Sequence, residues 1–333
     1  MVTPFTSRTI QVCFGPAALS QKKTRTAIPF PETLKPKYWP AWFGFLLLSS
    51  ITRLPFAWQS AIGRQLGRLT YRVAKKRRKI AEINLQLCFP QLSPEARTQL
   101  LRQNFEYIGM AAIETGLSWW GPKQRLEALG KITGMEHLEQ ALTQGKGVIL
   151  LTGHLTSLDI GGQILAAKLC DTDHPLQVMY KRSRNILVET MTKRGRERFT
   201  RRIFVRKDLR RFFRGLQENL PTWYAPDQDF GRHGNTVFAP FFGVSTATLT
   251  TTARLSKKTG APIVPYFPIR LPNDQGYEIR LLPALENFPS NDDIEDARRI
   301  NHLLEQIIQE YPAQYLWLHR RFKTRPEGEA SVY

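Results

Sequence analysis

The segment Gly147-Val-Ile-Leu-Leu-Thr-Gly-His-Leu-Thr-Ser-Leu-Asp159 decides the fold of this chain. A glycine introduces the apolar run Val148 to Thr152, which is bounded by turn residues and is typical of a buried strand. Thr156 or Ser157 can begin a helix directly afterwards. A strand that leads into a helix through a short loop is the repeating unit of a parallel sheet, so the segment predicts an α/β fold.

Further strands and helices are predicted on both sides of this segment. The pair Ser93-Pro94 marks a helix start, with serine as the N-cap and proline at the first helical position. A last long helix is expected over residues 292–310, acidic at its start and apolar on one face. Additional strand candidates, most of them separated by helical patterns, are residues 176–180, 222–225, 263–268 and 277–282. We therefore expect residues 131–333 to form one α/β domain with a mainly parallel sheet flanked by helices.

Composition excludes several classes of protein. The 333 residues include 48 Lys+Arg and 28 Asp+Glu, which gives a formal net charge of +20, and 42% of the residues are hydrophobic. That usage is typical of a globular protein and excludes a wholly disordered chain. Apolar runs of the roughly 18 to 20 residues of a strong transmembrane helix are missing, which excludes a multi-spanning transporter. Three widely separated cysteines favour a reducing compartment over a disulfide scaffold or a thiolate zinc site.

The N-terminal part predicts a membrane attachment. Residues 1–37 read as a poorly ordered basic lead without a cleavable signal. Residues 38–58 contain a 13-residue apolar run, 39–51, whose helix would rise about 20 Å, short of a bilayer core of about 30 Å. Tryptophans flank this run, as is common at lipid headgroups. We expect a membrane-anchor helix that either spans marginally or lies in the interface; the alternative is a buried helix of the domain.

Residues 59–130 are predicted to be helical and to pack with the domain that follows as one unit. Apolar residues recur at helical spacing between Ile62 and Leu87, beside the basic cluster Lys75-Lys76-Arg77-Arg78-Lys79. A basic amphipathic helix after an apolar anchor is typical of a cytoplasmic membrane surface. Nucleic-acid binding could use the same charges but would not require the tryptophan-rich run, so we favour the membrane.

His154 and Asp159 are the first candidate catalytic residues. His154 follows the strand, and reactive groups gather at the carboxyl ends of strands in α/β sheets. A carboxylate on one ring nitrogen fixes the tautomer and leaves the other nitrogen basic, which suits proton abstraction from a hydroxyl. The alternative is that Thr156-x-x-Asp159 is only a capping box and His154 only a polar loop residue.

Two later segments could complete a site. The basic stretches 193–198 and 204–208 could hold an anionic group by bidentate arginine pairing. A strand then ends in a turn that carries Asp227 and Asp229. Paired aspartates could instead hold a divalent metal, although no further carboxylate or histidine cluster lies nearby in the sequence.

Taken together, these segments resemble the late acyltransferases of lipid A biosynthesis, the lauroyl, myristoyl and palmitoleoyl transferase group. That group is distantly related to glycerolipid acyltransferases with a histidine–four–acid motif. The resemblance runs from about Tyr38 to the C-terminus. It is carried by residues 38–44, 84–90 and 134–137, the pair His154 and Asp159, Tyr224-Ala-Pro-Asp-Gln-Asp-Phe-Gly231, and Leu316-Trp-Leu-His-Arg-Arg-Phe-Lys-Thr-Arg-Pro-Glu-Gly328.

The resemblance implies transfer of an acyl chain from an acyl carrier protein thioester to a hydroxyl on a hydroxyacyl chain of Kdo-lipid IVA. Neither a cofactor nor a metal is implied, and nucleic acid is not an expected partner. Inner-membrane lipids are expected partners, with the domain facing the cytoplasm. The alternatives are a glycerophosphate or another glycolipid as acceptor and, in a different class, a basic membrane protein that binds nucleic acid without catalysis.

Residue roles follow from the same resemblance. His154 would be the general base and Asp159 its orienting acid, while Arg196, Arg206, Asp227 and Asp229 would bind substrate. The chain departs from the family pattern at two positions. Many lauroyl-type members have glutamate where this chain has Asp159, and arginine-proline where it has Lys181-Arg182. His319 and Trp317 are expected either to pack against the site or only to fix the terminus.

Overall fold

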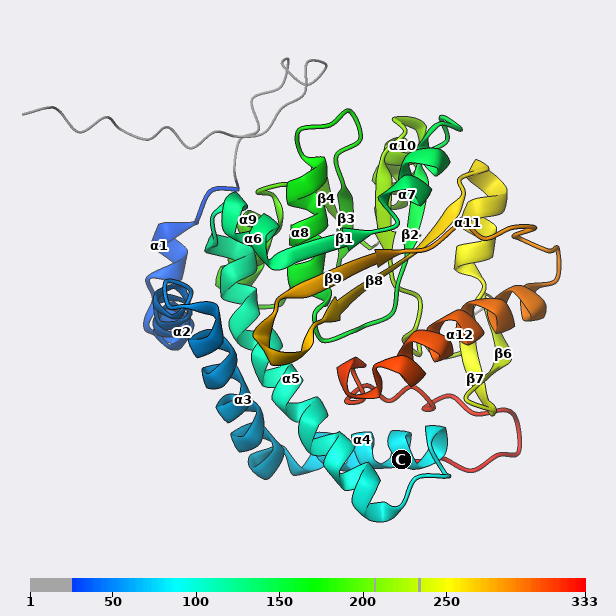
Figure 1. Cartoon of the computed structure of the whole chain (residues 1–333), viewed down its shortest axis with the longest axis horizontal. Helices are drawn as coiled ribbons and strands as arrows, with labels where there is room; N and C mark the ends of the chain where they lie inside the picture. Colours follow the sequence, from blue (N-terminus) through cyan, green and yellow to red (C-terminus); the bar gives the residue numbers. More distant parts are fainter. Residues whose placement is uncertain (1–25, 207, 233–234) are drawn as a thin grey trace, which may run out of the picture.

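A seven-stranded sheet forms the centre of the molecule. The computed structural model describes residues 26–206, 208–232 and 235–333. Neighbouring strands follow the order β1-β9-β8-β2-β5-β3-β4, and every pair is parallel except β8 and β9 (Figure 1). The strands are β1 Gly130–Thr133, β2 Val148–Leu151, β3 Gln177–Tyr180, β4 Arg202–Val205, β5 Pro221–Tyr224, β8 Ile263–Arg270 and β9 Tyr277–Leu281. The predicted mainly parallel sheet is confirmed.

The sequence patterns missed the two edge strands and a hairpin. β1 and β4 lie at opposite ends of the strand order. They carry mixed patterns, Gly-Lys-Ile-Thr and Arg-Ile-Phe-Val, because an edge strand need not be apolar on both faces. The hairpin of β6 (Thr236–Phe241) and β7 (Val244–Leu249) forms a separate two-stranded sheet.

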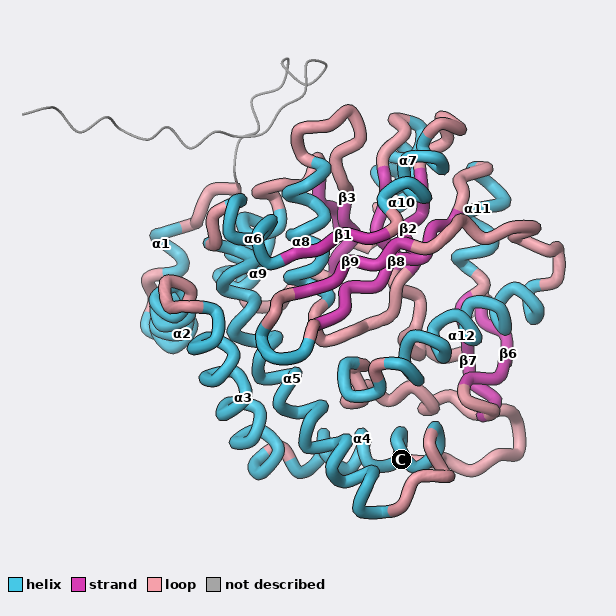
Figure 2. The backbone as a smooth tube through the Cα atoms, viewed as in Figure 1, coloured by secondary structure: helices cyan, strands magenta, loops and turns pink. Residues whose placement is uncertain are grey.

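Helices cover both faces of the sheet (Figure 2). On the central strand β2, Ile149 and Leu151 face one core with side chains of α10, α11 and α12, while Val148 and Leu150 face the other with α6, α7 and α8. Alternate strand residues point to opposite faces, which explains why this strand is apolar throughout. These helices are α6 Lys123–Leu129, α7 Met135–Leu142, α8 Leu158–Leu169, α9 Ile186–Arg196, α10 Leu209–Gln217, α11 Thr251–Thr259 and α12 Asp293–Glu310.

The 27-residue helix α5 (Pro94–Trp120) lies between the N-terminal helices and the sheet (Figure 1). It begins as predicted, since the Ser93 side chain accepts a hydrogen bond from Ala96 N. Helix α3 (Phe56–Val73) packs closely along it through glycines: a Cβ added at Gly67 would lie 2.2 Å from Phe105 O. α5 contributes to both cores and so connects α3 to the sheet.

The N-terminal region differs from the expectation at two points. The helical stripe from Ile62 to Leu87 is two helices, because Ala74 has a non-helical backbone between α3 and α4 (Lys75–Cys88). This break lets α4 turn under the C-terminal segment, where Asn84 donates hydrogen bonds to Trp317 O and His319 O. Part of the predicted irregular lead is helical, in α1 (Phe30–Thr33) and the 3-10 turn Pro36–Tyr38. Residues 1–25 of the lead lie outside the described residues.

The predicted anchor is a short helix followed by a turn. α2 (Trp39–Ile51) ends five residues before α3 begins. Among the residues that the structure describes, no helix is both long enough and apolar enough to cross a bilayer. The spanning form of the expected anchor therefore finds no support.

Candidate functional site

His154 lies in the loop between β2 and α8, at the carboxyl edge of the sheet. Its backbone is held from two sides: its N–H donates to Asp227 Oδ2 at 2.8 Å, and its carbonyl accepts from Leu316 N at 2.9 Å. The side chain is 25% exposed, so the ring is fixed within the protein while one edge stays accessible.

The acid that contacts the ring is Asp227, which sequence analysis had placed among the substrate-binding residues. Asp227 Oδ1 lies 2.5 Å from His154 Nδ1, and the Asp227 side chain is 1% exposed. It follows β5, which pairs in register with β2 so that Leu151 is opposite Tyr224. A carboxylate on Nδ1 keeps the proton on that nitrogen, which leaves Nε2 unprotonated in the neutral ring. Among the described residues, Nε2 has no hydrogen-bond partner.

The two partners shift one another's pKa. Burial alone would lower the pKa of His154, but the charge and hydrogen bond of Asp227, with a smaller contribution from Asp159, raise it above its ordinary value. Burial would raise the pKa of Asp227, but the charge of His154 and its two hydrogen bonds outweigh this and lower the pKa to about 2. Asp227 is therefore a carboxylate throughout the physiological range, and it favours the protonated imidazole.

Asp159 does not orient the ring as expected. It lies in the first turn of α8, is 47% exposed, and pairs with Arg196 from the last turn of α9. Asp159 lies in the first turn of α8, as expected, but Nδ1 is bound by Asp227, so the ring is oriented from the loop after β5 and not from α8. The capping-box alternative is also wrong: Ser157 is the N-cap, and its hydroxyl donates to Pro268 O.

Arg206 and Asp229 lie near the same edge but in different settings. Arg206 is exposed, and its guanidinium lies 4.5 Å from the centre of the Phe230 ring. Both oxygens of Asp229 accept hydrogen bonds from the protein itself, from Thr324 N and Oγ1 and from Gly231 N. The Asp229 carboxylate thus fastens the C-terminal segment to the loop that carries Asp227.

The C-terminal segment, residues 316–328, packs against the site, which is one of the two alternatives given above for His319 and Trp317. His319 Nε2 accepts a hydrogen bond from Asp229 N at 3.0 Å, and burial lowers the pKa of His319. Trp317 is 1% exposed, with its ring 4.9 Å from that of Tyr315. The buried Trp317 therefore also fixes the C-terminal part of the chain to the hydrophobic core.

The metal alternative finds no set of ligands. Asp227 and Asp229 are engaged by different protein donors, His154 in one case and Thr324 in the other. Within residues 26–206, 208–232 and 235–333, no group of three or more His, Cys, Asp or Glu side chains could hold a metal ion.

Sequence reasoning missed Glu114 and Arg270, a buried ion pair that contacts the His154 loop. Glu114 does carry a signal, because it is the one acid in the otherwise uncharged stretch Tyr107-Ile-Gly-Met-Ala-Ala-Ile-Glu-Thr-Gly-Leu117. A carboxylate in such a helix needs a buried partner. The partner itself could not be chosen from the sequence.

Comparison with known proteins identifies the family of the chain. The family model described as bacterial lipid A biosynthesis acyltransferase matches residues 29–324. The chain belongs to this family. The matched residues include β2 and β5, which position His154 and Asp227. They also include residues 316–324, the first part of the C-terminal segment that carried the resemblance.

Individual lipid A acyltransferases are similar over nearly their whole length. The palmitoleoyltransferase of lipid A biosynthesis from Escherichia coli K12 is 38% identical over 303 residues, 91% of this chain and 97% of the relative. The lauroyltransferase of the same organism is 37% identical, covering 90% and 96%. The myristoyltransferase is 30% identical, covering 90% and 91%. The protein is therefore an acyltransferase of lipid A biosynthesis.

Proposed function

We propose that this lipid A acyltransferase moves a fatty acyl chain from an acyl carrier protein thioester to the 3-hydroxyl of a hydroxyacyl chain on Kdo-lipid IVA. The observation that carries the proposal is the His154 ring, held on Nδ1 by Asp227 with Nε2 accessible. A neutral imidazole in this state can remove a proton from an alcohol near pH 7. The names of the relatives support a fatty acyl donor and a lipid A precursor as acceptor.

The reaction needs no covalent enzyme intermediate. Nε2 takes the proton of the acceptor hydroxyl while its oxygen attacks the thioester carbonyl carbon. The tetrahedral intermediate then breaks its C–S bond, and the imidazolium returns the proton to the departing thiolate. Cys88 and Cys170 are poor nucleophiles for an alternative route, because both are buried and burial raises the pKa of the Cys88 thiol.

The remaining residues are proposed to hold the anionic substrates. Arg196 pairs with Asp159 and is 19% exposed, which leaves part of its guanidinium available beside the site. Arg206 is exposed at the carboxyl end of β4. The lipid A precursor is phosphorylated and the carrier protein is acidic, so a chain with a net charge of +20 attracts both.

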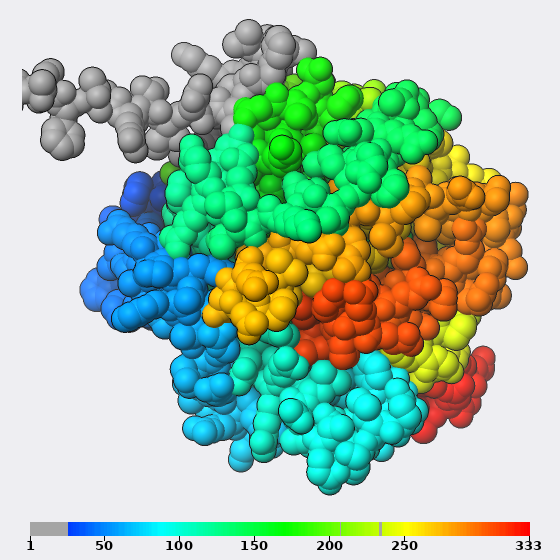
Figure 3. Space-filling model, viewed as in Figure 1, coloured from blue at the N-terminus to red at the C-terminus, as the bar shows by residue number. Residues whose placement is uncertain are grey.

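We further propose that α2 and α3 lie in the surface of the inner membrane, with the site on the cytoplasmic side. These helices form the blue edge of the molecule in Figure 3. Eight large apolar side chains of these helices are exposed: Trp39, Phe43, Leu46, Leu47, Trp58, Leu66, Leu69 and Val73. Such a set next to the basic start of α4 is typical of an interfacial helix pair on anionic lipids.

The donor and acceptor are tested with purified enzyme. A lauroyl thioester of acyl carrier protein and lauroyl-CoA are each offered with Kdo-lipid IVA, glycerol 3-phosphate or a lysophospholipid, and the products are weighed by mass spectrometry. We expect one added lauroyl chain on Kdo-lipid IVA, with the carrier protein as the preferred donor. A product on glycerol 3-phosphate or the lysophospholipid alone would support the alternative acceptor class.

Membrane binding is tested on the exposed face of α2. Changing Phe43, Leu46 and Leu47 together to serine is expected to weaken partitioning to anionic vesicles by about 10- to 100-fold, since each side chain loses part of its burial energy of about 1.5–3 kcal/mol. Leu209→Ser with Ile294→Ser is the matched control, because these side chains are also exposed but lie on α10 and α12. Equal loss of vesicle binding in both variants would contradict the assignment of this face.

A further inference from the structure

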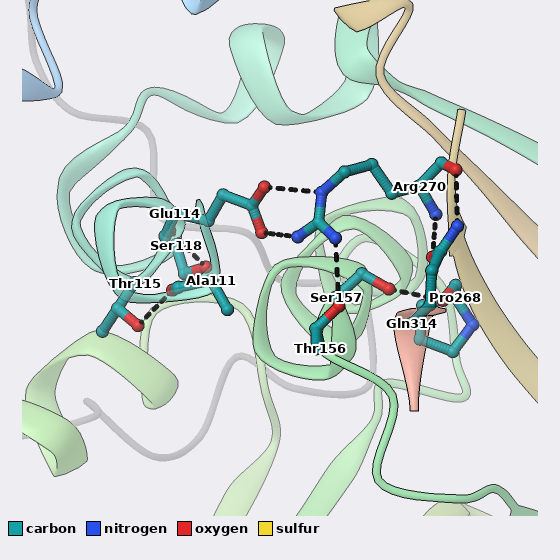
Figure 4. A network of polar contacts seen from close by, with 9 residues as sticks. All are labelled: Ala111, Glu114, Thr115, Ser118, Thr156, Ser157, Pro268, Arg270 and Gln314. Carbon is teal, nitrogen blue, oxygen red and sulfur yellow. Dashed lines mark hydrogen bonds and ion pairs between the residues drawn. The ribbon is translucent and has the colours of Figure 1, made fainter. Parts of the chain in front are cut away.

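Glu114 of α5 and Arg270 at the end of β8 form a buried ion pair (Figure 4). The side chains are 6% and 2% exposed, respectively. Arg270 Nε donates to Glu114 Oε1 at 3.0 Å and Nη2 donates to Oε2 at 2.6 Å, a bidentate arrangement that fixes the plane of the guanidinium. The ring of Tyr107 lies 4.9 Å from it and that of Tyr277 5.9 Å.

The remaining side of the guanidinium faces the loop of the catalytic histidine. Arg270 Nη1 donates to Thr156 Oγ1 at 3.0 Å, and Thr156 is the second residue after His154. Because Glu114 holds the other two nitrogens, Nη1 can point in one direction only. Figure 4 shows Glu114, Arg270 and Thr156 as one continuous chain of contacts.

The end of β8 is fastened to the same loop in two further places. Ser157 Oγ donates to Pro268 O at 2.5 Å. The side-chain amide of Gln314 accepts a hydrogen bond from Arg270 N at 2.8 Å and donates one to Arg270 O at 2.9 Å. The backbone carbonyl of Gln314 accepts a hydrogen bond from Thr156 N at 2.7 Å. The loop that presents His154 is thus held against β8 by a polar frame rather than by apolar packing alone.

A buried ion pair is weak evidence for stability, because apolar residues of similar volume often replace such a pair without loss of stability. Its directional bonds nevertheless fix geometry, and an error of about 1 Å in the placement of a reacting group can cost about 10²-fold in rate. We propose that Glu114 and Arg270 are positioning residues, which hold Thr156 so that His154 keeps Nδ1 on Asp227 and aims Nε2 at the acceptor hydroxyl. This inference rests on the proposed role of His154 as general base.

The test removes the hydrogen bond between Arg270 and Thr156 by changing one atom, and then restores it. Thr156→Val keeps the shape of the side chain but removes the oxygen that accepts from Arg270, while Thr156→Ser returns it. Arg270→Lys is a second, independent break, since a single ammonium cannot bind Glu114 bidentately and reach Thr156. Arg280→Met is the matched control on the neighbouring strand β9: Arg280 pairs with Glu278 and Glu310 and, among the described residues, makes no hydrogen bond or ion pair with the loop.

Each variant is assayed for kcat, for KM of donor and acceptor, and for the pH dependence of kcat/KM, all normalised to the folded fraction from thermal unfolding. For Thr156→Val and Arg270→Lys we expect kcat to fall about 10- to 100-fold with KM within about two-fold of the parent. The acidic limb of the pH profile should move to lower pH, because a ring that leaves Asp227 is more easily deprotonated. Thr156→Ser should regain most of kcat, and Arg280→Met should leave the limb where it is.

A merely structural role predicts a different result. Activity would then fall only with the folded fraction, and the acidic limb would stay in place in all four variants; that outcome overturns the inference, as does full activity of Thr156→Val. The variant His154→Ala distinguishes a failure of the positioning role from a failure of the general-base mechanism. If His154→Ala is inactive while Thr156→Val is unaffected, the positioning role alone is wrong, whereas an active His154→Ala removes the proposed mechanism itself.

Discussion

Replacing His154 with alanine is expected to lower kcat for acyl transfer by about 10²- to 10⁴-fold, the usual contribution of a general base. The reason is geometric: Nε2 is the accessible nitrogen of a ring whose other nitrogen is bound to Asp227. KM should change little, because the imidazole acts on the proton that moves in the transition state rather than on the bound ground state. Rates of product formation at saturating donor and acceptor measure the effect.

Two further variants make the result specific. His154→Gln fills most of the space of the ring and should be as inactive as His154→Ala, which removes a cavity as the explanation. His302→Ala is the matched histidine control, since that side chain is 62% exposed on α12. Activity of His154→Gln above a tenth of the parent value would refute the role of the imidazole.

The fold could be predicted because its strands are distinct in the sequence. The run Val148-Ile-Leu-Leu151 is fully buried on both faces, which only an apolar central strand of a parallel sheet tolerates. The edge strands were missed because each is only four residues long and begins with residues that are not apolar, Gly130-Lys131 in β1 and Arg202 in β4. The break at Ala74 could not be foreseen, since the apolar spacing continues across it and tertiary contacts of α4 with the C-terminal segment decide the direction of the chain.

The histidine of the site could be predicted, but its partner could not. Asp159 is five residues from His154 and Asp227 is 73 residues away, so local spacing favoured Asp159, whereas the acid bound to Nδ1 is Asp227. The decisive fact is that β5 is the neighbour of β2: Leu151 pairs with Tyr224, and His154 and Asp227 each lie three residues further on. Strand order is a property of the whole sheet, and no single motif encodes it.

Asp227→Asn is expected to reduce kcat/KM by about 10²- to 10⁴-fold, although the substitution changes only one oxygen to an amide nitrogen. Asp227 uses both oxygens as acceptors, one for His154 N–H and one for Nδ1. An asparagine has a single acceptor oxygen. If that oxygen stays on the backbone N–H, the amide donates to Nδ1 and moves the ring proton to Nε2, which then cannot accept a proton from the alcohol.

The pH profile of the same variant gives the second measurement. The neutral imidazole is the active form, and the carboxylate raises the pKa of His154, so activity of the parent enzyme should decline as pH falls through an apparent value above about 6.5. Without the carboxylate, burial lowers that pKa, and the acidic limb of Asp227→Asn should lie at lower pH than that of the parent. Asp229→Asn, two residues along the same loop, removes a carboxylate that binds Thr324 instead of His154. It should leave the limb in place, and a limb that moves equally in both variants would show that loop disorder, rather than the Asp227 charge, sets the basicity of the ring.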